Sequence, residues 1–398
     1  IKASYYFGAP VTNAKLKYKV MRQEHDTTWY PVGPWDWFYG RGYWWFGVDY
    51  PWYPGFHRWG CFAPSPWWWR RPAPQPEIVA DGEVEIGPEG VYQLKIDTAL
   101  AKAIHGDKDH KYSITAEVVD QSRRTIVGTG SVLAAREPYR VYAWVDRGYY
   151  TSGDTATAGF SARTPDGNPV IDAEAEIRLM RISYGRENQP TEKVVEAWTT
   201  TTGATGQFEQ KFVAAKPGQY RIAAKVTDAS GHVQEGGYIF NVRGKHYQSE
   251  HYRFNNLELI PDKKEYAPGE EVRLAVNSDS EDATVLLFVR PANGVYLRPR
   301  ILKLDGKSLT EAIRITRKDM PNFFVEALTV GKGDVHSLSR EIIVPPEKRV
   351  LHVDVLPGKE RYQPGEPAKV KIRVTDFSGE PYVGSTVVSV YDKSVEYI

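Results

Sequence analysis

The stretch Tyr362-Gln-Pro-Gly-Glu366 recurs along this chain, and its recurrence decides the fold. A second copy, Tyr266-Ala-Pro-Gly-Glu270, lies roughly a hundred residues upstream, and a weaker copy, Tyr150-Thr-Ser-Gly-Asp154, lies about as far again before it. Apolar residues alternate with polar ones on both sides of the last copy: Leu351, Val353 and Val355 precede it, and Val370, Ile372 and Val374 follow it. Similarity at this period predicts an array of like domains, each with strands on either side of the turn.

Short alternating runs separated by turn signals, with almost no helical periodicity, predict an all-β chain. The run from Ala14 to Val20 alternates with lysines, which predicts a half-buried strand with a lysine-rich outer face. The turns Gly8-Ala-Pro-Val11, Gly167-Asn-Pro-Val170 and Gly379-Glu-Pro-Tyr382 indicate the same hairpin position in each domain. Units of about 100 residues suit β-sandwiches, so we predict tandem domains of the immunoglobulin or fibronectin type.

Two polar stretches, Arg243 to Tyr252 and Pro345-Pro-Glu-Lys348, are typical of linkers. The predicted domains are 1–135, with an insertion at 29–76, then 136–244, 253–346 and 349–398. The last domain has too few strands to close a sandwich. We therefore expect the chain to be a piece of a longer protein.

Composition excludes several classes of function. The 398 residues carry 51 basic and 50 acidic side chains, a net charge of +1, so no global field attracts nucleic acid or an anionic membrane. No apolar run is long enough to form a transmembrane segment. The single cysteine, Cys61, excludes a disulfide framework within the chain. It is interpreted as a buried or incidental cysteine, with a reactive thiol as the weaker alternative.

The alternating pattern stops between residues 29 and 76, which hold ten of the twelve tryptophans among many glycines and prolines. One interpretation is a surface that binds a glycan or a protein partner, because aromatic faces stack on sugars and are enriched at interfaces. Arg58, Arg70 and Arg71 would add cation–π contacts. The other is a self-packed loop that covers the first sandwich like an extra small core. The candidate binding residues are Trp35, Trp37, Trp44, Trp45, Trp52, Trp59, Trp67, Trp68 and Trp69.

The segment from Leu351 to Ile398 resembles the start of the bait-region domain of the α2-macroglobulin family. The resemblance rests on the Tyr362 motif, on Val374-Thr-Asp-Phe-Ser-Gly379 and on Val387-Val-Ser-Val-Tyr-Asp-Lys-Ser-Val395, which departs from the family at Tyr391 and Lys393. The opening, Tyr5-Tyr-Phe-Gly-Ala-Pro-Val11, is similar to the third macroglobulin-like domain of bacterial members.

This resemblance implies consecutive macroglobulin-like domains that lead into a truncated bait-region domain. In that family a protease cuts an exposed bait segment, the molecule collapses around it, and in many members a thioester captures it. Cys61-Phe-Ala-Pro64 does not match the Cys-x-x-Gln type of thioester motif, so no thioester is expected in this chain. The resemblance implies target proteases as partners, through a bait region outside this chain, no catalytic residue or cofactor, and a secreted, periplasmic or cell-envelope location.

Other sites find little support in the sequence. The pairs His105 with His110 and His246 with His251 are each five apart and lack a nearby ligand cluster, so we expect solvated loop histidines, not a metal site. No motif for a catalytic nucleophile or a phosphate loop is present. An endopeptidase inhibitor is thus the first hypothesis, a structural or adhesive envelope protein whose Trp-rich loop binds a glycan or partner is the second, and an enzyme is the third.

Overall fold

The structure is a computed structural model that describes most of the chain. The residues that it describes are 1–6, 8–25, 28–59, 62–64, 75–106, 108–120, 122–185, 188–244, 251–291, 294, 298–331, 333–346, 350–359, 361–363, 365–376 and 379–390.

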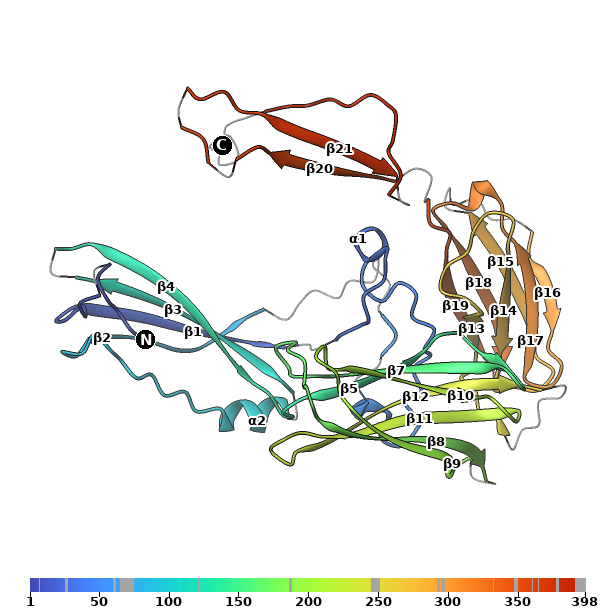
Figure 1. Cartoon of the computed structure of the whole chain (residues 1–398). Coiled ribbons are helices and arrows are strands. Elements are labelled where there is room, and N and C mark those ends of the chain that lie inside the picture. Colours follow the sequence, from blue (N-terminus) through green and yellow to red (C-terminus); the bar gives the residue numbers. More distant parts are fainter. Residues whose placement is uncertain are drawn as a thin grey trace.

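The first sheet has four antiparallel strands in the order β2-β1-β3-β4 (Figure 1). In β1, Leu16 and Val20 are fully buried while Lys15, Lys17 and Lys19 are exposed, which confirms the predicted half-buried strand. A short helix, α2, precedes β3. The bounds are β1 Lys15–Glu24, β2 Glu77–Glu85, α2 Ala99–His105, β3 His110–Val119 and β4 Thr125–Ala134.

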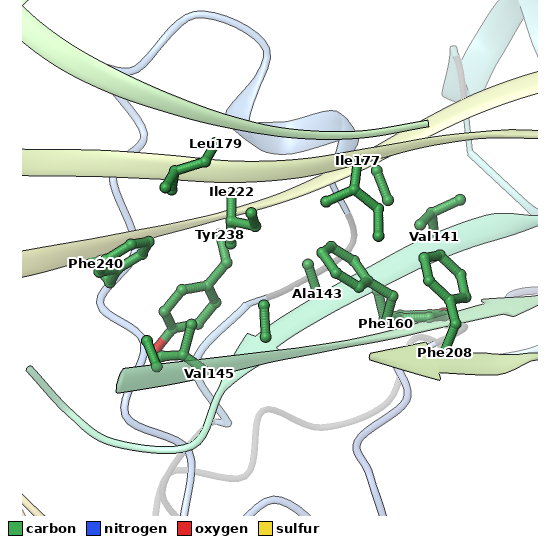
Figure 2. Close-up of a cluster of buried hydrophobic side chains, with 14 of the residues drawn as sticks. Val141, Ala143, Val145, Phe160, Ile177, Leu179, Phe208, Ile222, Tyr238 and Phe240 are labelled. Carbon is green, nitrogen blue, oxygen red and sulfur yellow. The ribbon is translucent and has the colours of Figure 1, made fainter. Parts of the chain in front are cut away.

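The second group of strands forms a sandwich of a three-stranded sheet, β10-β7-β5, and a five-stranded sheet, β6-β12-β11-β8-β9. Figure 2 shows the core between these two sheets. Residues of the five-stranded sheet face the following residues of the three-stranded sheet: Val141, Ala143, Val145, Phe160 and Phe208. The bounds are β5 Arg140–Val145, β6 Tyr150–Thr151, β7 Thr155–Arg163, β8 Glu174–Tyr184, β9 Pro190–Thr201, β10 Gln207–Val213, β11 Gly218–Thr227 and β12 Val233–Arg243.

The third group repeats this arrangement with a three-stranded sheet, β13-β14-β17, and a four-stranded sheet, β16-β15-β18-β19. Apolar residues of both sheets, such as Val272, Leu274, Val285 and Val325, share one buried cluster. The bounds are β13 Glu258–Pro261, β14 Glu271–Asn277, β15 Thr284–Pro291, β16 Arg300–Lys303, β17 Ser308–Arg314, β18 Asn322–Gly331 and β19 Asp334–Ile343.

The last two described strands, β20 (Leu351–Pro357) and β21 (Val370–Asp376), pair only with each other in the part of the chain that the structure describes. None of their residues is buried. The all-β, tandem sandwich prediction is confirmed by this series of sheets. The boundaries 1–135, 136–244, 253–346 and 349–398 stay predictions.

The predicted hairpin recurs with the same bonds. In its first copy Tyr5 and Gly8 are joined by a backbone hydrogen bond, and Ser4 forms an isolated bridge with Pro10. The corresponding bridges elsewhere are Arg163 with Pro169 and Thr375 with Pro381. The prediction of one shared hairpin position is therefore confirmed.

The tyrosine motifs also form one kind of turn. In the Tyr266 turn (residues 262–270), the Glu270 carboxylate accepts the backbone N–H of Ala267 at 2.9 Å, and the Tyr266 hydroxyl donates to Asp262 at 2.7 Å. Asp262 also accepts the N–H of Arg273 on β14. Gly269 has φ +101°, a left-handed conformation that favours glycine.

The Tyr362 turn (residues 358–366) repeats the bond between Glu366 and the N–H of Gln363 at 3.1 Å. Gly358 stands where the Tyr266 turn has Asp262, so the Tyr362 hydroxyl donates to the carbonyl of Lys369 instead. The two turns thus share the glutamate bond and a glycine at positive φ, and they differ in the group that accepts the tyrosine hydroxyl.

Candidate functional site

The aromatic segment, defined as described residues 28–59 and 62–64, joins β1 to β2, but none of its residues belongs to the buried cluster of the first sheet. It contains only the short helices α1 (Asp36–Tyr39) and η1 (Phe56–Arg58). In Figure 1 its blue trace runs from the first sheet to the region between the second and third sandwiches. Its many glycines and prolines explain why it forms no strand of its own.

One part of the segment extends the core of the second sandwich. Trp44, Trp45 and Phe46 belong to the same buried cluster as the residues of Figure 2. The Trp45 ring lies edge-on to Tyr238, with ring centroids 5.6 Å apart. Such edge-to-face pairs add about 0.5–1.5 kcal/mol to the effect of burial.

A second part covers the outer face of the five-stranded sheet. Side chains on a strand alternate between faces, so Ile182 and Ile239 point away from the core that Leu179 and Phe240 help to form. Those outward residues pack against the aromatic segment in a separate buried cluster. The aromatic members of that cluster are Tyr50, Tyr53, Phe56, Trp59 and Tyr184.

An ion-pair group borders this cluster. The Arg221 guanidinium bridges Glu192 at 2.5 Å and Glu235 at 2.6 Å, and it lies 5.0 Å from the Trp59 ring centroid. The Tyr53 hydroxyl donates to Glu192 at 2.5 Å. The aromatic segment therefore takes part in satisfying a largely buried charge.

The same segment is bonded to the third sandwich. The Trp52 indole N–H donates to Asn255 Oδ1 at 3.1 Å, and Asn255 Nδ2 donates to the carbonyl of Asp49 at 3.0 Å. The Tyr39 hydroxyl donates to the carbonyl of Pro321 at 2.7 Å.

Charged side chains of the third sandwich add further bonds. The Tyr43 hydroxyl donates to Glu265, and the Arg340 guanidinium donates to the carbonyl of Trp45. The Lys264 ammonium lies 3.9 Å from the Trp44 ring centroid. Residues of both sandwiches thus hold the aromatic segment from opposite sides.

The two sandwiches also meet directly. A Cβ atom at Gly148 would overlap the carbonyl oxygen of Pro261, so the two main chains touch at this point. Tyr149 packs against Ile260 and Ala275, and its hydroxyl donates to the carbonyl of Arg273 at 3.0 Å. This close approach requires glycine at 148.

A buried carboxyl group lies where the three parts meet. Glu258 on β13 is fully buried, accepts the N–H of Asn255 at 2.8 Å and accepts Asn277 Nδ2 at 3.2 Å. Burial is the largest cause that raises its pKa to about 7, and a hydrogen bond from Tyr50 opposes that rise.

The structure places the candidate tryptophans unequally. Trp35, Trp44, Trp45 and Trp59 are at most 5% exposed, so their rings serve packing and are closed to a ligand from solvent. Trp37 is 62% exposed. Trp52 is half-buried, with the Arg253 guanidinium 3.9 Å from its ring centroid. Trp67, Trp68, Trp69, Arg70, Arg71 and Cys61 lie outside the described residues.

The expectation that this loop covers the first sandwich is wrong. The buried members of the aromatic segment pack against the second sandwich and bond to the third. Aromatic residues indicate that a segment is buried but carry no information about which distant sheet buries it.

The expectation of solvated loop histidines is wrong for His110, which begins β3 and is 6% exposed. Its ring centroid lies 5.4 Å from that of His105 at the end of α2. The alternation of Tyr112, Ile114 and Ala116 extends back by two residues to His110, a signal that could have found its burial. No group of three or more metal-ligating side chains occurs among the residues that the structure describes, and His246 lies outside them.

The chain is similar to known proteins along its whole length. The family model "Alpha-2-macroglobulin bait region domain" matches residues 257–398. An alpha-2-macroglobulin homolog of Nostoc sp. is 23% identical over 422 residues, covering 99% of this chain and 20% of that protein. Another, from Deinococcus radiodurans, is 27% identical over 274 residues, covering 68% of this chain and 23% of that protein.

Solved structures give weaker matches. Native Escherichia coli alpha-2-macroglobulin matches 94% of this chain and 24% of that chain, with 12% identity and a TM-score of 0.33. The trypsin-activated E. coli protein matches the same shares with 13% identity and a TM-score of 0.35. This chain spans less than a quarter of the length of the relatives named above. Within the described residues, no helix is both long enough and apolar enough to cross a membrane.

Proposed function

Because this chain belongs to the alpha-2-macroglobulin family, we propose that it is part of the scaffold of an endopeptidase inhibitor that works by bait cleavage and conformational trapping. Its partners would be target proteases, and it would contribute no catalytic residue. A location in the periplasm or outside the cell would bring it into contact with such proteases.

The observation that supports this proposal most strongly is the position of the family match. It covers the third sandwich and the unit of β20 and β21, whereas the sequence alone predicts the bait-region domain only from Leu351 onward, after consecutive macroglobulin-like domains. The aromatic segment bonds to that third sandwich and packs in the core of the second. A trap requires that a local cut be converted into a large movement, and stiff coupling of neighbouring domains serves this need.

The test uses the full-length protein that contains this chain, mixed with a trypsin-like and an elastase-like protease. A trapped protease keeps its activity on a small chromogenic peptide but loses activity on a large protein substrate, and small-angle scattering detects compaction. If cleavage of the large substrate is unchanged and no compaction occurs, the trap function is wrong.

A pair of variants tests the role of the aromatic segment in this function. Trp44→Ala removes a buried ring that contacts both sandwiches, so we expect weaker protection of the large substrate. Trp37→Ala changes a ring that is 62% exposed and is the matched control. Equal protection by both variants would contradict a coupling role for the segment.

The second candidate function, binding of a glycan or protein partner, is favoured by one exposed aromatic pair. Trp37 and Phe38 are 62% and 46% exposed, with ring centroids 5.5 Å apart. Tryptophan fluorescence during titration with cell-wall saccharides tests this candidate. A response that survives in Trp37→Ala would place the binding elsewhere.

A further inference from the structure

A pocket of about 260 Å³ lies beside α2, where β3 begins and β4 ends, and none of the functions above uses it. It belongs to the first sheet and shares no lining residue with the aromatic segment. The polar side chains that line it are Thr98, Lys102, Lys108, His110, Tyr112 and Arg136.

His110 lines this pocket and has buried ring nitrogens without hydrogen-bond partners. It is only 6% exposed, and neither ring nitrogen has a hydrogen-bond partner. A neutral imidazole has one N–H donor and one acceptor, and burying them without partners costs free energy. Burial, followed by the nearby Arg22, lowers the pKa of His110, which favours the neutral ring. A ligand in the pocket would supply the missing partner.

The charges around the pocket indicate that a ligand there would be negatively charged. Lys102, Lys108 and Arg136 line it, and no carboxylate does. Lys108 pairs with Glu24 at 2.9 Å and Arg136 pairs with Glu137 at 3.2 Å. Lys102 has no ion pair among the residues that the structure describes, so its charge stays uncompensated.

The neighbouring buried carboxylate, that of Asp109, already has hydrogen-bond and ion-pair partners. Asp109 accepts the backbone N–H of Arg136 at 2.7 Å, and Arg140 pairs with it at 3.0 Å. Near His110, Arg22 bonds to Glu77 and to the His105 ring. A metal cation would therefore meet ammonium and guanidinium groups, whereas an anion would meet donors.

We propose that this pocket binds a small tetrahedral oxyanion of the phosphate class. The His110 N–H would donate one hydrogen bond, and the ammonium groups of Lys102 and Lys108 would supply charge-assisted ones. Lysine serves as a point charge for phosphate, and the small volume limits the ligand to inorganic phosphate or a compact phosphate ester.

The experiment titrates the whole 398-residue chain with inorganic phosphate at constant ionic strength, with chloride as the reference salt. Isothermal titration calorimetry measures affinity, and thermal unfolding measures stabilisation, because a ligand that binds only the folded state raises Tm. We expect saturable binding that Lys102→Ala weakens at least about tenfold, the loss expected when a charged hydrogen bond is removed. Lys193→Ala, an exposed lysine on β9, is the matched control and should bind like the wild type.

His110→Gln keeps a polar side chain, and His110→Phe removes it. Both should weaken binding, with the greater loss in His110→Phe. If His110→Phe fails to fold, Lys102→Ala decides the outcome. Absence of saturable binding, or equal affinity in Lys102→Ala, Lys193→Ala and the wild type, would mean an ordinary solvent-filled pocket and overturn the proposal.

Discussion

The Tyr266 turn and the Tyr362 turn are the same local structure in two different surroundings. Both close with a glutamate that accepts a backbone N–H three residues earlier, and both place glycine at positive φ. Tyr266 is 3% exposed and is held by Asp262, whereas Tyr362 is half-buried and stands opposite Gly358. Short-range sequence therefore builds the turn, while tertiary packing determines how much the turn stabilises the fold.

The largest expected effect separates the two tyrosines. Tyr266→Ala leaves a cavity in the core of the third sandwich, so we expect the free energy of unfolding to fall by about 3–5 kcal/mol. Tyr362→Ala should cost less than about 1 kcal/mol, because Tyr362 is only half-buried and neither β20 nor β21 contains a buried residue. Urea unfolding followed by circular dichroism measures both. Similar losses at the two positions would show that the turn itself, and not its surroundings, supplies the stability.

The two turns also differ in a carboxyl group that lies four residues before each of them. Glu258 is buried with its pKa raised to about 7 from 4.5, whereas Asp354 is only half-buried and pairs with Arg373 at 2.7 Å. Between pH 4.5 and about 7 the folded protein binds more protons than the unfolded chain, because Glu258 stays protonated only in the folded state. The contribution of Glu258 is therefore fully present below pH 4.5 and is lost as pH rises through 7, a change of about 3 kcal/mol.

Glu258→Gln should remove this fall in the free energy of unfolding. The variant therefore gains stability over the wild type as the pH rises from about 5 to about 8. The measurement is urea unfolding at a series of pH values. Asp354→Asn is the matched control and should keep the wild-type slope. A wild-type slope that persists in Glu258→Gln would assign the pH dependence to another group.

A smaller effect is expected from the anchor of the Tyr266 turn. Asp262→Ala removes the acceptor of the Tyr266 hydroxyl and of the Arg273 N–H, which should cost about 1–2 kcal/mol. The double variant Asp262→Ala with Tyr266→Phe tests the bond, since the two losses should be less than additive. Strict additivity would mean that the hydroxyl bond contributes nothing.

The smallest expected effect is one that the two turns share. Lys263 pairs with Glu270 at 2.9 Å on the surface, and Lys359 pairs with Glu366 in the same way. Lys263→Ala should cost about 0.5 kcal/mol or less, and the loss should vanish in high salt. Unfolding at low and high sodium chloride checks this. A larger, salt-independent loss would indicate that the lysine stem packs on Tyr266.

The repeating architecture could be predicted because its signals are local. Alternation around Leu16 and Val20 identified β1, and the Gly-x-Pro turns identified a hairpin that recurs three times. The family resemblance also started from such a local motif. These features depend on neighbours within a few residues, which sequence reading covers well.

The candidate site could be located but not assembled from the sequence. Glu258 lies between Leu257 and Leu259, so alternation places it on the solvent side of its strand. All four residues of β13 are nevertheless buried, and Tyr50 of the aromatic segment lies against the outward face. When a segment about two hundred residues away in the chain buries a strand, the sequence of that strand does not show it.

Gly148 makes the junction of the second and third sandwiches a contact between main chains. Side chains can change rotamer and absorb small shifts, but a backbone in contact with a backbone has no such slack. A rotation of the third sandwich would therefore be transmitted to the second sandwich with little loss, because the two are rigidly coupled at this contact. Even alanine at 148 would act as a wedge there, and it would change the angle between the two bodies before it changed either body's own fold.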